Sequence, residues 1–100
     1  MTAITSLTNP KVKLSVKLRQ HNKRRDTRLF LIEGYRELLR AIDAGHPVQT
    51  LFYCPELFLG ENERELIERT DAEILSCSPD VFRKISYRDR PDGLLAIAPQ

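Results

Sequence analysis

Cationic side chains are concentrated at the N-terminal end of this chain of 100 residues. The first 28 residues hold eight of the sixteen Lys and Arg residues and only one of the fourteen acids, so this segment carries +7. The other 72 residues carry −5, and the overall charge of +2 conceals two regions of opposite sign. Long cationic side chains without neighbouring acids attract phosphate groups, so the chemistry offered here is the binding of a polyanion.

Several of these cations have the spacing of one helix face. If the basic segment is one continuous helix, Lys13, Lys17, Arg24 and Arg28 fall within a sector of about 60°. Arg25 belongs to the same cluster. A face that serves only solubility usually carries both signs of charge, whereas acids are nearly absent here. We therefore favour a surface that binds a phosphate backbone.

The turn after the first β-prone run is a second candidate site. Glu33-Gly34 ends that run and opens a helix with Arg36 in its first turn. Ligands of α/β sheets tend to bind at strand ends, and helix N-termini present free N–H groups to phosphates. An ordinary turn glycine, with Arg36 in an ion pair with Glu37 or Glu33, explains the pattern equally well. The sequence leaves both interpretations open.

The loop before the last apolar run is a third candidate. It contains Arg88 and Arg90, ends at Gly93, and follows Tyr87, whose ring is able to stack on a base. A loop of this kind is weak evidence by itself. Together with a basic helix it supports a nucleic-acid surface.

Patterns typical of catalysis are missing from the sequence. His21 and His46 are isolated, and we predict surface residues rather than general bases. The four glycines form no phosphate-binding loop, and the acids between 61 and 73 are typical of a solvated helix face. Cys54 and Cys77 have no Cys or His partner at metal-ligand spacing, so we expect buried, reduced thiols in a cytoplasmic protein. We predict no catalytic residue, no metal and no cofactor in this chain.

The elements that must position these groups alternate along the chain. The patterns predict two helices over residues 10–25 and 35–45, and two more that begin at residues 62 and 79. They predict strands over 29–32, 48–54, 72–77 and 94–98. The order α-β-α-β-α-β-α-β places helices on both faces of a sheet, so we predict a three-layer α/β/α sandwich with a four-stranded mixed sheet. The first helix is ambiguous, because apolar and polar residues alternate from Val12 to Leu18. Its length and its Lys, Arg, Gln and Leu content favour helix.

Three signals mark helix starts, and one marks a buried strand. Asn9-Pro10 and Ser78-Pro79-Asp80 each combine a capping side chain with a first-turn proline. Asn62-x-x-Glu65 has the spacing of a capping box. The last run, residues 94–98, is nearly all apolar and is expected to be buried on both faces.

Length and composition fit one soluble domain, with 41% hydrophobic and 30% charged residues. No apolar run is long enough to cross a bilayer, and the N-terminus has no signal-peptide pattern, so we expect neither a membrane partner nor export. We also expect residues 1–8 to be flexible and the isolated domain to be monomeric.

The sequence resembles the N-terminal substrate-binding domain of the SpoU-type (TrmH-like) RNA ribose 2′-O-methyltransferases. That domain typically shows Asn-Pro, a Lys/Arg-rich helix, Phe-x-x-Glu-Gly, an Arg two residues on, and Ala-Gly at the helix end. The matching residues here are Asn9-Pro10, Lys17, Arg24-Arg25, Phe30, Glu33-Gly34, Arg36, Ala41 and Gly45. The loop over 86–93 and the hydrophobic last strand also resemble that domain.

The resemblance implies a fold like that of kink-turn-binding ribosomal proteins. It implies that Glu33, Gly34 and Arg36 lie beside the Arg88–Arg90 loop and grip structured RNA, either rRNA or tRNA, with added phosphate contacts from the basic helix. Family enzymes continue into a knotted domain that holds S-adenosylmethionine and usually dimerises. Because this chain stops at Gln100, we expect that cofactor and the methyl transfer to belong to a part it does not contain.

Two other functions stay open at this stage. One is a free-standing kink-turn-type ribosomal RNA-binding protein, which the gene sequence beyond codon 100 would distinguish. The other is a protein–protein adaptor whose basic face meets an acidic partner. Structured-RNA binding weakens steeply with salt, and preference for a folded RNA over an acidic polypeptide would disfavour the adaptor.

Overall fold

The last strand of the chain lies between the first two in a four-stranded mixed sheet. A computed structural model describes residues 4–100, and its strand order is β1-β4-β2-β3. The strands are β1 (Leu29–Glu33), β2 (Thr50–Tyr53), β3 (Glu73–Ser76) and β4 (Leu94–Pro99). β4 runs antiparallel to both β1 and β2, whereas β2 and β3 are parallel. The mixed sheet predicted from the sequence is confirmed, with strands slightly shorter than expected at 48–54 and 72–77.

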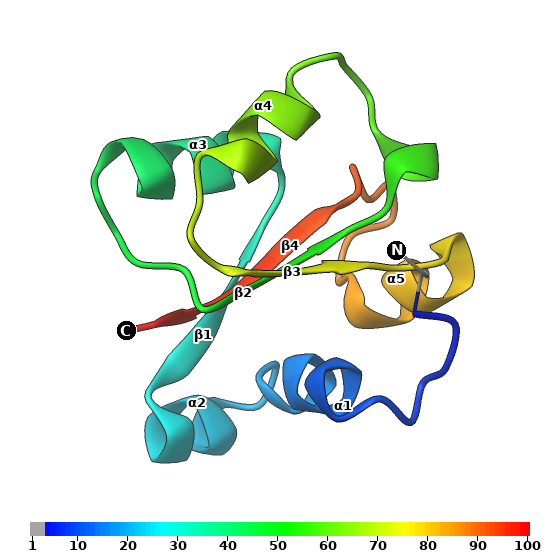
Figure 1. The fold of residues 1–100 in the computed structure, drawn as a ribbon. Coiled ribbons are helices and arrows are strands. Elements are labelled where there is room, and N and C mark those ends of the chain that lie inside the picture. Colours follow the sequence, from blue (N-terminus) through cyan, green and yellow to red (C-terminus); the bar gives the residue numbers. More distant parts are fainter. Residues whose placement is uncertain (1–3) are drawn as a thin grey trace.

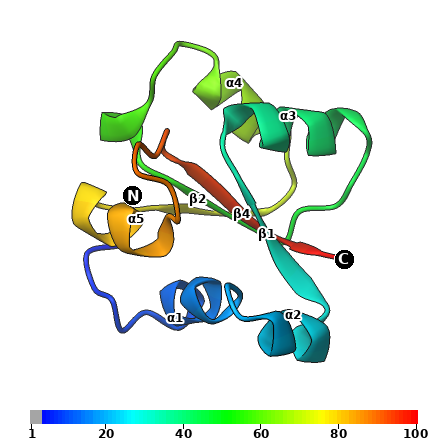
Figure 2. The same ribbon diagram turned by 180° about the vertical axis from the view of Figure 1, so that it is seen from behind.

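Helices cover both faces of this sheet (Figures 1 and 2). One layer contains α1 (Pro10–Lys17), α2 (His21–Thr27) and α5 (Pro79–Ile85), and the other contains α3 (Tyr35–Asp43) and α4 (Glu63–Glu68). A short 3₁₀ helix, η1 (Pro55–Leu57), follows β2. The three-layer α/β/α sandwich is therefore confirmed.

The basic segment is two helices, so the prediction of one continuous helix was wrong. α1 ends at Lys17 and α2 begins at His21, with Gln20 in an extended conformation between them. The Arg24 side chain donates to the backbone oxygens of Leu18, at 2.9 Å, and Arg19, at 2.7 Å. These are carbonyls that a continued helix would have bonded internally. The single stripe of Lys13, Lys17, Arg24 and Arg28 does not form, because the first two and the last two belong to different helical segments.

Two of the three capping predictions are confirmed. Asn9 Oδ1 accepts from the amide of Lys11 at 2.9 Å, and Ser78 Oγ accepts from the amide of Val81 at 3.3 Å. The capping box at Asn62 does not form, because Asn62 already has near-helical angles (φ −98°, ψ 0°) and its side chain makes no capping bond. Glu63 instead accepts from the amide of Gly60 at 2.9 Å.

β4 divides the core into two halves. Leu95 and Ile97 pack in one cluster with Phe52 and Phe82, on the side of α1 and α5. Leu94, Ala96 and Ala98 pack on the other side, where Leu38 of α3 and Leu66 of α4 are buried. The expectation that this strand is buried on both faces is confirmed.

Ile4, which precedes the first helix, forms backbone hydrogen bonds at the end of β3. The amide of Ile4 donates to Ser76 O at 2.7 Å, and the amide of Ser78 donates to Ile4 O at 3.0 Å. The expected flexibility of residues 1–8 falls partly on residues 1–3, which lie outside the described residues, and it stays a prediction. Within residues 4–100, no helix combines the length and the apolar character that a bilayer crossing requires.

Both cysteines are buried thiols, as the sequence predicted. Burial raises the pKa of Cys77 to about 12 and also raises the pKa of Cys54. A thiol with a raised pKa stays protonated at pH 8, and the protonated form is not nucleophilic.

We therefore expect neither Cys54 nor Cys77 to react with Ellman's reagent at pH 8 in the native chain, and both to react after denaturation in guanidinium. Absorbance at the thionitrobenzoate band measures the number of thiols modified. Rapid modification of either thiol in the native chain would contradict their burial.

Candidate nucleic-acid interface

The turn from β1 into α3 favours glycine through its backbone conformation, and the Arg88 side chain lies against it. Gly34 has φ 101° and ψ 152°, in the region that residues with a side chain rarely adopt. A Cβ at this position would lie 2.8 Å from the Cζ atom of Arg88. The backbone of the turn is therefore open to close approach, and in the free chain Arg88 occupies that space.

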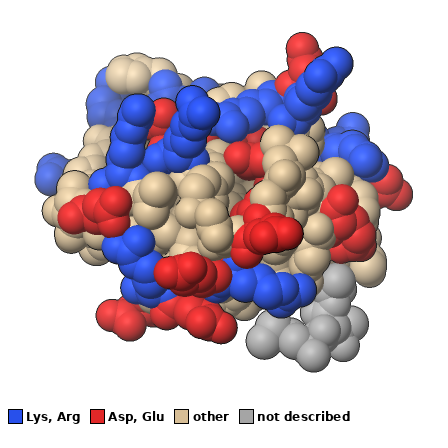
Figure 3. Space-filling model, turned by 90° about the horizontal axis from the view of Figure 1, so that it is seen from above, with Lys and Arg blue, Asp and Glu red and all other residues tan. Residues whose placement is uncertain are grey.

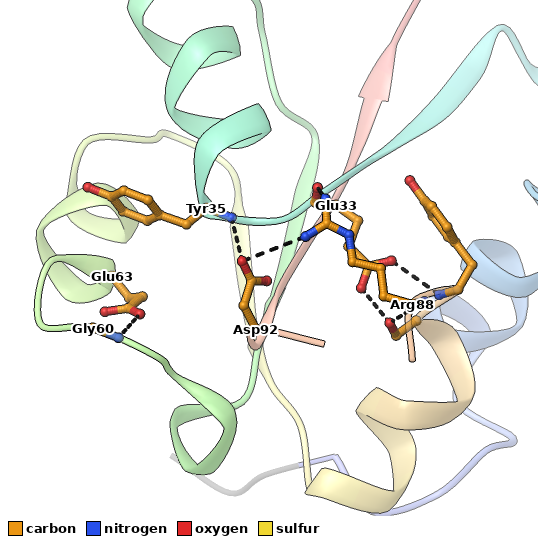
Figure 4. Close-up of polar contacts among 8 residues, drawn as sticks. Glu33, Tyr35, Gly60, Glu63, Arg88 and Asp92 are labelled. Carbon is orange, nitrogen blue, oxygen red and sulfur yellow. Dashed lines mark hydrogen bonds and ion pairs between the residues drawn. The ribbon is translucent and has the colours of Figure 1, made fainter. Parts of the chain in front are cut away.

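Glu33 is a buried acid whose two carboxylate oxygens hold the loop that follows α5. Its side chain is buried, the hydroxyl of Ser86 donates to Oε2, and the amide of Tyr87 donates to Oε1 at 3.1 Å. The Arg88 guanidinium donates to the backbone oxygen of Glu33 at 2.8 Å (Figure 4). Glu33 thus positions the loop, and its carboxylate has no oxygen left without a partner.

Asp92 ties the other end of the loop to α3. Its Oδ2 atom accepts from the amide of Tyr35 at 2.8 Å, at the first residue of that helix. Gly34 has no side chain with which to cap α3, so Asp92 supplies the cap from a distant part of the sequence. Asp92 also lies 3.9 Å from Arg88 Nη1. Residues 86–92 are therefore attached to the turn at both ends.

The predicted residues of the turn and the loop do lie together. Glu33 and Gly34 contact Arg88, and the exposed Arg36 lines a cavity of about 420 Å³ with Arg88 and Asp92. In the part of the chain that the structure describes, Arg36 forms no ion pair with Glu33 or Glu37, because Glu33 is bonded to the loop and Glu37 lies 3.5 Å from Arg40. The contact of the turn and loop residues with RNA stays a prediction.

Arg90, the other predicted arginine of this loop, is exposed, and across residues 4–100 it forms no hydrogen bond or ion pair through its side chain. The Arg90 side chain is thus available to bind a partner, but no contact among the described residues fixes its orientation.

A second group of predicted cations gathers around α2. Arg24, Arg25 and Arg28 line a cavity of about 430 Å³ with His21 and Gln100, and no acid lines it. Arg28 adopts the left-handed conformation (φ 57°) that ends α2. Lys13 and Lys17 are exposed on α1 and are not part of this cavity. The ten predicted residues therefore fall into a turn–loop group, an α2 group and two lysines on α1.

Arg19 connects the basic segment to the loop, and the sequence reasoning missed it. Its Nη2 atom donates to the backbone oxygens of Lys84, at 2.7 Å, and Ser86, at 2.8 Å. Ser86 in turn bonds Glu33, so the break between α1 and α2 is joined to the turn through two residues. In the sequence Arg19 is one cation among eight, and only its position beside the break distinguishes it.

Tyr87 projects from this network with its side chain 57% exposed. Partial burial and the negative charge of Glu33 raise the pKa of its hydroxyl, so Tyr87 is a neutral phenol at physiological pH. Its backbone is fixed by the bond to Glu33. An exposed aromatic ring on an anchored backbone is suited to stacking on a base, as the sequence suggested.

The opposite side of the molecule has a different character. Figure 3 looks onto the side of α3 and α4, where Lys and Arg are interspersed with Asp and Glu. Among residues 4–100 no group of three or more His, Cys, Asp or Glu side chains is arranged to hold a metal ion. The cavity lined by Arg24, Arg25 and Arg28 lies with α2, on the other side of the sheet.

Solved structures that superpose on this chain include RNA methyltransferases. A crystal structure of an RNA 2′-O ribose methyltransferase superposes with a TM-score of 0.83 at 35% identity, over 98% of this chain and 37% of that one. The SpoU methyltransferase AviRb from Streptomyces viridochromogenes, solved in complex with AdoMet, superposes with a TM-score of 0.75 at 28% identity, over 92% of this chain and 33% of that one. The fold is thus that of the corresponding domain of SpoU-class methyltransferases.

The family follows from the sequence match. Residues 9–96 match the model of the MRM3-like substrate binding domain, and the chain belongs to that family. The 23S rRNA (uridine(2479)-2′-O)-methyltransferase of S. viridochromogenes is 30% identical over 81 residues, which are 80% of this chain and 28% of that protein. The chain thus spans roughly a third of the length of these relatives, and the resemblance found in the sequence is confirmed.

Replacing the distant cap tests the attachment of the loop. We expect Asp92→Ala to lower the free energy of unfolding by about 1 kcal/mol, because the first amide of α3 loses its partner. Chemical denaturation monitored by circular dichroism measures the change. Asp89→Ala is the matched control, since Asp89 is exposed in the same loop. Equal effects of the two substitutions would contradict the capping role of Asp92.

Proposed function

We propose that this chain recognises rRNA as substrate for a 2′-O-ribose methyltransferase. The observation that carries the proposal is the bonded connection from the basic segment, through Arg19 and Ser86, to the Glu33–Gly34 turn in a member of this substrate-binding family. The names of the relatives support both the reaction and, for the S. viridochromogenes enzyme, rRNA as the substrate.

The role of this chain in that reaction is to bind and orient RNA. Glu33 is an unsuitable general base, because it is 2% exposed and both of its carboxylate oxygens accept hydrogen bonds. His46 Nε2 lies 2.7 Å from the backbone oxygen of Pro99 and is likewise engaged. We therefore assign the transfer step to a part of the enzyme beyond these 100 residues, consistent with the greater length of the relatives.

S-adenosylmethionine supplies the methyl group when bound to enzymes of this class. A cavity of about 720 Å³ is lined by Arg19 and Arg24 and by no Asp or Glu side chain. A sulfonium cation does not fit beside two arginines. We accordingly place the methyl donor elsewhere in the enzyme and assign it no ligand in this chain.

Charge removal on α1 tests the RNA-binding role. We expect Lys13→Gln/Lys17→Gln to weaken binding to a transcribed 23S rRNA fragment and to reduce the slope of log affinity against log salt by roughly 1 to 2, because up to two phosphate contacts are lost. Fluorescence anisotropy titrations at several salt concentrations measure both quantities.

Arg40→Gln/Arg64→Gln is the matched control, because it removes the same charge from exposed positions of α3 and α4 across the sheet. The proposal is contradicted if the two double variants lose equal affinity, or if the unaltered chain does not bind the rRNA fragment.

A further inference from the structure

Two neighbouring cavities on the α2 side share two of their lining residues. The larger, of about 720 Å³, is lined by Phe30 and Leu31 of the edge strand β1 and by Tyr87 and Arg19; we call it the edge groove. The smaller is the 430 Å³ cavity around α2, which we call the basic pocket. Arg24 and Gln100 line both, so an apolar, aromatic space opens directly beside a cationic one.

The aromatic residues of the edge groove are anchored to the fold in different ways. Phe30 meets the His46 ring edge-to-face, with centroids 5.7 Å apart, and His46 is fixed by its contact with Pro99 O at 2.7 Å. The backbone amide of Tyr87 donates a hydrogen bond to Glu33, while its ring is exposed. Aromatic side chains have few rotatable bonds, so they bind planar ligands at low entropic cost.

The arginines of the groove are also fixed in orientation. Arg19 donates from Nη2 alone, and Arg24 from Nη1 alone, to backbone oxygens. Each guanidinium therefore keeps a flat face and further N–H donors for a ligand. No acidic side chain lines the edge groove or the basic pocket, and Asp26, 3.9 Å from Arg25 Nε, is the acid paired with one of their arginines, so the complementary ligand is anionic and has apolar, planar parts.

We propose that the edge groove binds an unpaired base of the substrate RNA and that the basic pocket binds the adjoining phosphate. This inference rests on the proposed function and adds to it the class of RNA structure recognised. Stacking on Tyr87, the exposed ring of the groove, requires an exposed base face, which an unpaired nucleotide offers and a continuous duplex does not. Arg25 and Arg28 meet the phosphate, and Arg24 contacts both parts of the nucleotide.

The test compares two RNA probes on the 100-residue chain. One is a short hairpin with a single-stranded loop, and the other is a blunt duplex with the sequence of its stem. We expect Tyr87→Ala to weaken hairpin binding about tenfold, the loss typical of one stacking contact, and to leave duplex binding unchanged. Tyr87→Phe retains the ring and is expected to bind the hairpin like the unaltered chain. Anisotropy titrations measure all six affinities.

Crosslinking locates the contact independently of any substitution. With 4-thiouridine in the hairpin loop, we expect ultraviolet crosslinks to map to peptides containing Phe30 or Tyr87. Crosslinks confined to α3 or α4 would overturn the inference, and so would hairpin affinity that Tyr87→Ala leaves unchanged.

Further outcomes distinguish a failure of the unpaired-base site from a failure of RNA recognition as a whole. Equal binding of hairpin and duplex by the unaltered chain, with Tyr87→Ala unaffected on both, overturns the unpaired-base site and leaves RNA recognition standing. Binding of neither RNA overturns both. Displacement of the hairpin by polyglutamate at equal charge concentration shows an acidic polypeptide to be the better occupant and also overturns the inference.

Discussion

The carboxylate of Glu33 lies at the end of β1, shielded from water, and the rest of the site depends on how its charge is accommodated. Burying a carboxylate is costly unless its oxygens are hydrogen-bonded, and an oxygen left without a partner costs about 1–3 kcal/mol. Both partners come from one segment, through the Ser86 hydroxyl and the Tyr87 amide. Burial of this one side chain therefore fixes the start of a loop more than fifty residues away in sequence.

The rest of the loop follows from that attachment. Once residues 86 and 87 are fixed, Arg88 lies over Gly34 and Asp92 reaches the first amide of α3. Arg19 bonds the backbone on the other side of the same loop, so the break between α1 and α2 takes its position from Ser86 as well. One buried acid thus connects the turn, the loop and the cationic segment, three regions that the sequence presents separately.

Helix caps and the buried last strand are determined by neighbouring residues, so they could be predicted from the sequence. Asn9 and Ser78 cap their helices, and the uninterrupted apolar run at residues 94–98 forms the central strand because only a strand buried on both faces suits it. The family resemblance added the pairing of the Glu33–Gly34 turn with the Arg88 loop, which spacing alone did not indicate.

The features that could not be predicted from the sequence depend on tertiary contacts. The basic segment has the composition of one long helix, but Leu18 is buried and Arg24 bonds the carbonyls at the break, and both interactions exist only once the sheet is formed. Asp92 caps a helix whose first residue is 57 positions away, so no pattern of neighbours reveals it. Asn62 has the sequence spacing of a capping box, but its backbone is already near-helical and its side chain makes no capping hydrogen bond.

The site requires that the loop is held against the turn before RNA binds, and hydrogen–deuterium exchange of the free chain tests this attachment. We expect the amide of Tyr87, bonded to buried Glu33, and the amide of Tyr35, bonded to Asp92, to exchange far more slowly than the amide of Asp89 in the same loop. Exchange of Tyr87 as fast as that of Asp89 would show that the loop is not held against the turn.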